Sequence, residues 1–139
     1  MYTVEQTLKT GVSAVRPKAL LYRLGEETET GRTLRAVLRE RHILTLTIEA
    51  NQIGETVGRL AATNAAPVDA PTPPDAPETG LLLLCALGDR QLDRLLADLR
   101  RAGASVPYKA VLTERNREWA FRDLVAEVAR EHEFLKNSQ

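Results

Sequence analysis

The residues best suited to chemistry in this sequence lie in one stretch, residues 109–119. Lys109 offers a positive charge, Thr113 and Asn116 offer hydrogen-bonding groups, and Trp119 offers a large flat surface. The stretch follows the end of a predicted strand, and ligands of open α/β sheets usually bind at the carboxyl ends of strands. These four side chains could therefore hold a small anionic or planar ligand, or contact a protein partner.

A purely structural interpretation of the same residues is also open. Thr113 and Asn116 are typical turn and cap residues, because their side chains satisfy unpaired backbone amides. Trp119 could hold the loop on an aliphatic core, and Lys109 could be a strand lysine that faces solvent. A catalytic role for Lys109, as nucleophile or acid-base group, would require that its amine be desolvated.

Other chemical motifs are missing from the sequence. His42 and His132 have no cysteine or second histidine at metal-ligand spacing. The single cysteine, Cys85, lies within the apolar run 81–87 and is expected to be a buried strand residue. The loop 25–31 contains three glutamates, which would repel a phosphate, and no glycine-rich nucleotide motif is present. We therefore expect no metal and no cofactor, and we favour a non-enzymatic role.

Composition narrows the possible partners. The chain has 139 residues, of which 43% are hydrophobic and only 4% aromatic, so its core must be aliphatic. Nineteen basic residues balance nineteen acidic ones, which makes a nucleic-acid partner unlikely, because phosphate neutralisation needs surplus positive charge. The first residues carry no signal-peptide pattern, and the longest apolar run is far too short to cross a bilayer. We expect a cytoplasmic protein without a membrane partner.

A proline-rich segment divides the chain. Five of the seven prolines fall within residues 63–79, together with acidic residues and alanines. Proline removes backbone donors, and such a composition has little to bury, so we expect an extended acidic linker that crosses outside the sheet. The two predicted halves are then residues 1–62 and residues 80–139.

The first half shows alternating strand and helix patterns. We expect a strand at 19–24, a helix at 34–41, a strand at 44–48 and a helix that follows Asn51. Residues 1–16 show no clear pattern.

The second half repeats this order. We expect a strand at 80–86, a helix capped by Asp89 and ended by Gly103, a strand at 106–113 and a last helix near 121–136. A helix between two strands makes those strands parallel. The fold class is therefore predicted as α/β: two β-α-β-α halves, an internal repeat, that form one four-stranded, mainly parallel sheet with flanking helices.

The segment K-A-x-x-T-x-x-N-x-x-W at 109–119 resembles a bacterial family of domains of unknown function. The resemblance covers roughly residues 80–132. Family members often carry a threonine after the tryptophan, where this chain has Ala120, which leaves the cap of the last helix to Asn116 or to water. The resemblance implies the fold of this half and the importance of the segment, and it implies no activity.

These observations favour a non-enzymatic regulatory or interaction module that uses the loop 109–119. The alternative is a small anionic-ligand binder, or a vestigial enzyme, at the same loop. A homodimer would also fit, because a four-stranded sheet has two edges that need cover.

Overall fold

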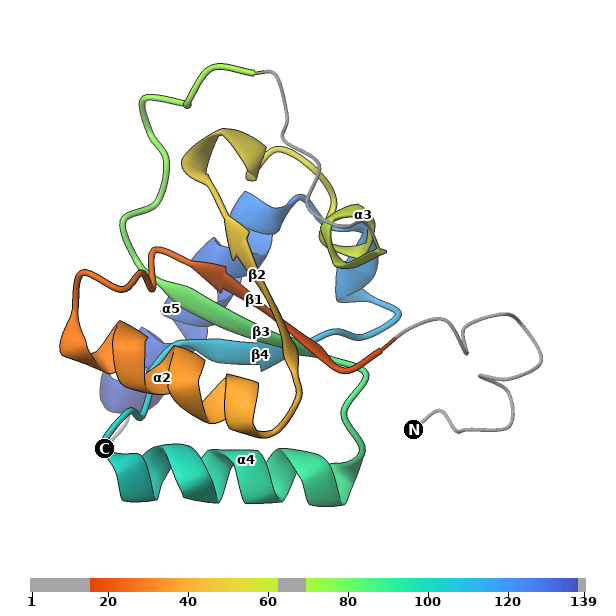
Figure 1. Cartoon of the computed structure of the whole chain (residues 1–139). Coiled ribbons are helices and arrows are strands. Elements are labelled where there is room, and N and C mark those ends of the chain that lie inside the picture. The colour runs from red at the N-terminus through yellow and green to blue at the C-terminus, as the bar shows by residue number, and fades with distance from the viewer. Residues whose placement is uncertain (1–15, 63–69, 138–139) are drawn as a thin grey trace.

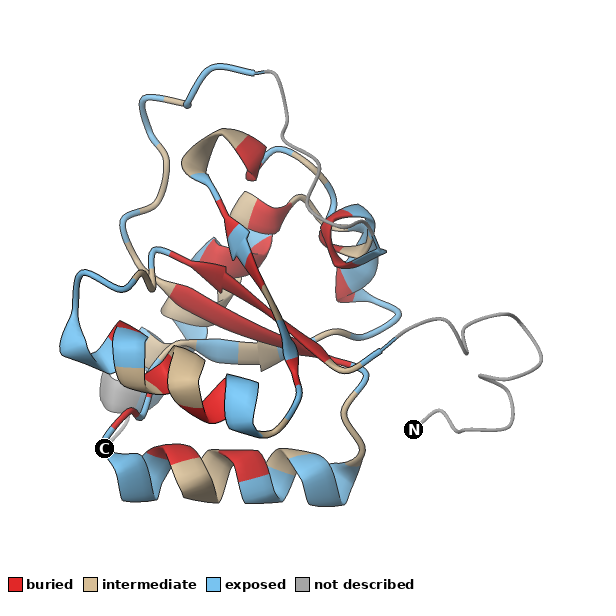
Figure 2. Cartoon of the chain, in the orientation of Figure 1, coloured by how far each residue is buried: buried red, intermediate tan, exposed pale blue. Residues whose placement is uncertain are grey.

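Two short aliphatic strands form the centre of the protein. β1 (Lys18–Tyr22) and β3 (Leu81–Cys85) are buried along their whole length, because each lies between two other strands and beneath helices on both faces (Figures 1 and 2). The computed structural model describes residues 16–62 and 70–137. The unassigned segment 1–16 thus lies outside the description except for its last residue.

The sheet has the strand order β2-β1-β3-β4, with β2 (Leu44–Ile48) and β4 (Lys109–Val111) at its edges. Within each half the two strands are parallel, and the halves meet through the antiparallel pair of β1 and β3. The predicted α/β fold with a mainly parallel four-stranded sheet is confirmed. Because β1 and β3 run in opposite directions, the carboxyl ends of the two parallel pairs lie at opposite ends of the sheet.

The crossover helices cover one face of the sheet (Figure 1). They are α2 (Glu29–Glu40) and α4 (Asp89–Ala102). The prediction that Asp89 caps α4 is wrong: Gly88 is the N-cap, and the aspartate lies in the first turn, where its charge suits the helix dipole. The end of α4 at Gly103 is confirmed, with the left-handed φ of 78° that glycine adopts without a steric cost.

The other face carries two short 3-10 helices, each followed along the chain by an α-helix. These are η2 (Ala50–Gln52), α3 (Val57–Ala62), η3 (Asn116–Glu118) and α5 (Phe121–Asn137). The expected helix after Asn51 is present in part, because a 3-10 turn and then a six-residue helix form there. The reason is tertiary: the intervening backbone pairs with a distant segment and cannot continue the helix.

Two further predicted boundaries change for local reasons. β4 covers only residues 109–111 of the predicted strand 106–113. Pro107 has no amide to donate at its start, and the Asn116 side chain binds the carbonyl of Val111 at its end. Residues 70–79 of the proline-rich segment form no helix or strand. The rest of that segment, 63–69, lies outside the description, and the division of the chain into domains there stays a prediction.

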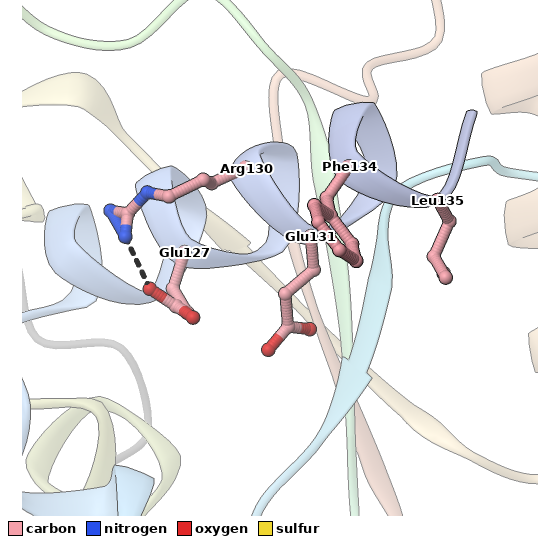
Figure 3. Close-up of a pocket in the computed structure, with 5 residues that line it drawn as sticks. All are labelled: Glu127, Arg130, Glu131, Phe134 and Leu135. Carbon is pink, nitrogen blue, oxygen red and sulfur yellow. Dashed lines mark hydrogen bonds and ion pairs between the residues drawn. The ribbon is translucent and has the colours of Figure 1, made fainter. Parts of the chain in front are cut away.

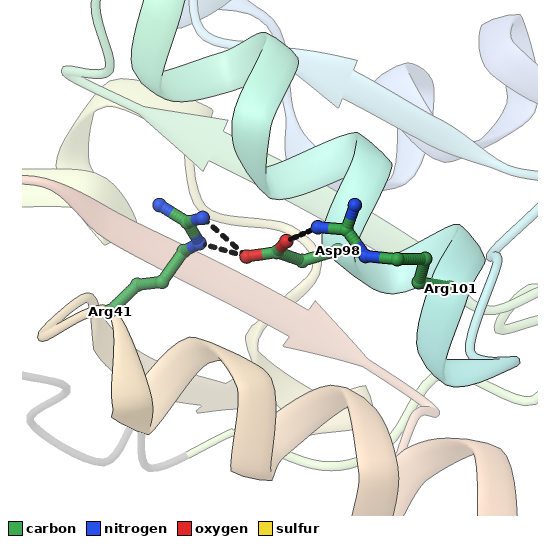
Figure 4. Close-up of polar contacts among 3 residues, drawn as sticks. All are labelled: Arg41, Asp98 and Arg101. Atoms are coloured by element: carbon green, nitrogen blue, oxygen red, sulfur yellow. Dashed lines mark hydrogen bonds and ion pairs between the residues drawn. The ribbon is translucent and has the colours of Figure 1, made fainter.

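An ion-pair network joins the two crossover helices (Figure 4). The carboxylate of Asp98 on α4 binds Arg41 at the end of α2 and Arg101 one turn further along α4. The hydrogen bond from Arg41 is the main cause that lowers the pKa of Asp98 below its usual value of 3.8, with a further contribution from Arg101. The network therefore stabilises the folded protein only while Asp98 is ionised.

Asp98→Asn tests this network through its pH dependence. Because the folded-state pKa is lowered, the contribution of Asp98 is present above the unfolded pKa and is lost as the pH falls through the folded pKa. We expect the urea midpoint of the wild type to exceed that of the variant at pH 6, and the two midpoints to converge as the pH falls through the folded-state pKa of Asp98. A difference that stays constant over this range would contradict the assignment.

Gly31 is required by a close backbone approach in α2. A Cβ atom at this buried position would lie 1.8 Å from the carbonyl oxygen of Gly25. We expect Gly31→Ala to lower the free energy of unfolding by about 2 kcal/mol, because this clash with the main chain outweighs the gain in helix propensity. Gly54→Ala is the matched control, since a Cβ there meets no atom within 4 Å. Urea denaturation followed by circular dichroism compares the two, and equal stabilities would refute the prediction.

Candidate functional site

The turn after β4 is closed by reciprocal hydrogen bonds. The amide of Thr113 donates to Oδ1 of Asn116 at 2.9 Å, and the amide of Asn116 donates to Oγ1 of Thr113 at 3.0 Å. Nδ2 of Asn116 also donates to the carbonyl of Val111 at 3.0 Å. Asn116 is only 8% exposed, so its amide group serves the turn itself.

Trp119 connects this turn to the first half of the chain. Its carbonyl accepts a hydrogen bond from the amide of Val57 at 2.8 Å. Its half-buried side chain packs on the apolar cluster under α3 and α5. On the outside, the guanidinium of Arg115 lies 5.7 Å from the centre of the indole ring, within the range of a cation–π contact. Trp119 is therefore both a packing residue and part of the surface.

The start of α5 is capped by main-chain groups of the first half. The amide of Phe121 donates to the carbonyl of Glu55, and that of Arg122 donates to the carbonyl of Ile53, each at 2.9 Å. Ala120 pairs with Thr56 in an antiparallel bridge between these bonds. The prediction that Asn116 or water supplies this cap is wrong for these two amides, because the carbonyls of Glu55 and Ile53 accept them instead.

Lys109 lies apart from the other three predicted site residues. Its ammonium group donates to the carbonyl of Val106 at 2.8 Å, before β4 begins, whereas Thr113 and Asn116 follow the strand. The side chain is exposed, so the desolvation that a catalytic amine requires is missing. The structure thus brings together Thr113, Asn116 and Trp119, without Lys109.

A shallow cavity of about 380 Å³ lies elsewhere, on the last turns of α5 (Figure 3). An ion pair of Arg130 and Glu127, 2.6 Å long, borders it. Its lining includes no predicted site residue and consists of one helix face: Glu127, Arg130, Glu131, Phe134 and Leu135.

Groups that could bind metals or act as nucleophiles are scarce in the described part of the chain. No cluster of three or more His, Cys, Asp or Glu residues occurs there. Cys85 is buried in β3, and this burial raises the pKa of its thiol to about 12, so the sulfur stays protonated at neutral pH.

Residues 16–62 and 70–137 contain no helix long and apolar enough to span a bilayer.

The sequence analysis did not identify one buried polar residue of the first half. Gln52 is only 3% exposed, and its Oε1 accepts the amide of Glu49 at 2.6 Å. The pair has the same three-residue spacing and the same amide-to-side-chain bond as Thr113 and Asn116. This shared spacing after the second strand of each half is the signal that could have revealed it.

Asn116→Ala tests the structural role of the turn. The change removes the partners of the Thr113 amide and the Val111 carbonyl, so we expect the free energy of unfolding to fall by about 2 kcal/mol. The exposed neighbour Glu118, replaced in Glu118→Ala, should change it by less than about 0.5 kcal/mol. Urea denaturation measures both variants. If Asn116→Ala were as stable as Glu118→Ala, the turn would not depend on this side chain.

Comparison with known proteins identifies the second half only. Residues 81–135, from the start of β3 into the last turns of α5, match a family model described as Domain of unknown function (DUF3783). No curated protein and no solved structure matches the chain significantly. The resemblance that the segment 109–119 indicated is thus confirmed, and the second half of this chain is similar to a domain of unknown function.

Proposed function

We propose that the protein is a non-enzymatic interaction module and that the exposed side of residues 109–119 contacts a protein partner. The observation that carries this proposal is the pair of Arg115 and Trp119, stacked at the surface of a fixed turn. Tryptophan and arginine are the side chains most enriched among residues that dominate binding energy at protein interfaces. We propose that this module has a regulatory role and acts in the cytoplasm.

The turn is suited to binding because its backbone is already fixed. The bonds between Thr113 and Asn116 close it, and the bond from Val57 to the carbonyl of Trp119 ties it to α3. A preorganised surface loses little conformational entropy when a partner binds. The turn also carries exposed charges of both signs, which favour specificity over indiscriminate adhesion: Glu114, Arg115, Arg117 and Glu118.

A small anionic ligand at the same loop receives less support. Such a ligand would need the positive charge of Lys109 beside the polar groups of Thr113 and Asn116. The ammonium group instead binds the carbonyl of Val106, and the side-chain amide of Asn116 binds the turn. We therefore carry the protein-contact hypothesis forward.

Arg115→Ala is the sharpest test, because this side chain is exposed and its removal leaves the core untouched. Proteins captured by the wild type in cells, and then purified, would be titrated against each variant. We expect Arg115→Ala to weaken the affinity of a genuine partner about tenfold or more. Trp119→Phe should weaken it less, because a ring remains against the core.

Arg90→Ala is the matched control, since this exposed arginine belongs to α4 on the opposite face of the sheet. It should bind every partner as the wild type does. The proposal fails if each captured protein binds Arg115→Ala and Arg90→Ala with equal affinity.

A further inference from the structure

The carboxyl end of β1 binds part of the proline-rich segment, which we call the strap (residues 73–77). The hydroxyl of Tyr22, the last residue of the strand, donates to the carbonyl oxygen of Pro77 at 2.5 Å. Nε of Arg23 donates to the same oxygen at 2.7 Å. One carbonyl of the strap is therefore recognised by two side chains that follow each other at the end of β1.

A second anchor holds the strap to the start of α5. Nη2 of Arg122 contacts Oδ2 of Asp75 at 2.8 Å, and the aspartate side chain is 74% exposed. Between the anchors, Ala76 packs against the apolar cluster under α3 and α5. The strap thus presents a carboxylate, a small apolar side chain and a proline carbonyl, in this order, to groups of the folded protein.

The recognising groups are fixed by the fold rather than by the strap. The Tyr22 ring is fully buried and packs edge-on against Phe121, so that only its hydroxyl is available to a neighbour. The Arg23 guanidinium lies 5.2 Å from the centre of that ring, and its Nε also donates to the hydroxyl at 3.0 Å. The left-handed φ of Arg23, 56°, recurs after β3 at Ala86, 64°, so it belongs to the way in which both strands end.

The contacts of the strap are those of a bound peptide. Residues 73–76 of the strap form a turn, in which the amide of Ala76 donates to the carbonyl of Pro73. Its prolines restrict the unbound chain and so lower the entropy lost on docking. Arg122 of the protein faces the carboxylate of Asp75, so the charges at this anchor are complementary, and Arg23 donates to the neutral carbonyl of Pro77.

We propose that Tyr22, Arg23 and Arg122 form a peptide-binding site for proline-containing acidic segments that adopt this turn, and that the strap is its internal occupant. A segment of the same chemistry in another protein binds there when the strap is released. The site shares no residue with the surface at 109–119, so it stands or falls independently of the proposed function.

The probe is a fluorescent peptide with the sequence of residues 71–79, PTPPDAPET, titrated against the full chain. A tethered strap competes at an effective concentration on the order of millimolar, so the wild type should bind the peptide weakly. In Asp75→Lys the strap is repelled by Arg122. We expect this variant to bind the peptide about tenfold or more tightly than the wild type does. Glu78→Lys, an equal charge change next to the strap, is the control and should bind as the wild type does.

Additional substitutions in the Asp75→Lys variant test where the peptide binds. Tyr22→Phe removes only the hydroxyl and keeps the packed ring, whereas Arg23→Gln and Arg122→Gln each remove one exposed or half-exposed charge. Each should weaken peptide binding about tenfold or more. A peptide with lysine in place of its aspartate should also bind more weakly.

Two results would overturn the proposal. One is that a folded Asp75→Lys chain, verified by circular dichroism, shows no saturable peptide binding at millimolar concentration. The other is that binding is equally tight in Arg23→Gln and Arg122→Gln. The arginine variants keep the test decisive even if Tyr22→Phe fails to fold, because both leave the buried ring of Tyr22 and its contact with Phe121 in place.

Discussion

The antiparallel pairing of β1 with β3 is the constraint on which the remaining structure depends. It joins two parallel strand pairs into one sheet and buries the central strands completely. Because the two pairs run in opposite directions, the loops after their strands face opposite ends of the sheet. The chain covers this sheet at two further places, the start of α5 and the carboxyl end of β1.

At the start of α5 that cover is backbone. Residues 53–57 pair with residues 119–122, so each half satisfies helix amides of the other. Gly58 fits this contact because a Cβ atom there would lie 3.0 Å from the carbonyl oxygen of Arg117. We call this paired backbone the joint. The segment 109–119, which has the most distinctive sequence, therefore ends in the joint and also forms part of the surface. These two roles agree, because the joint fixes the turn that presents Arg115.

At the carboxyl end of β1 the cover is the strap. The strap is bound through the carbonyl of Pro77, the exposed carboxylate of Asp75 and the side chain of Ala76, whereas the joint consists of paired main chain. Polar side-chain contacts at a surface are individually weak and screened by solvent. A competing peptide of the kind proposed above would therefore displace the strap more readily than it would open the paired backbone. The two covers thus differ in strength for an identifiable physical reason.

Local pattern in the sequence determined most of the elements of this protein, apart from the extent of the helix after Asn51 and of β4. The strand at 44–48 and the end of α4 at Gly103 follow from alternation and from glycine chemistry, and Thr113 and Asn116 were recognisable as turn residues. Only the tertiary structure decided the antiparallel junction, the cap of α5 by Glu55 and Ile53, and the pairing of Tyr22 with the strap. These depend on contacts between residues far apart in the chain, and periodicity within a short window carries no information about which distant backbone will meet it.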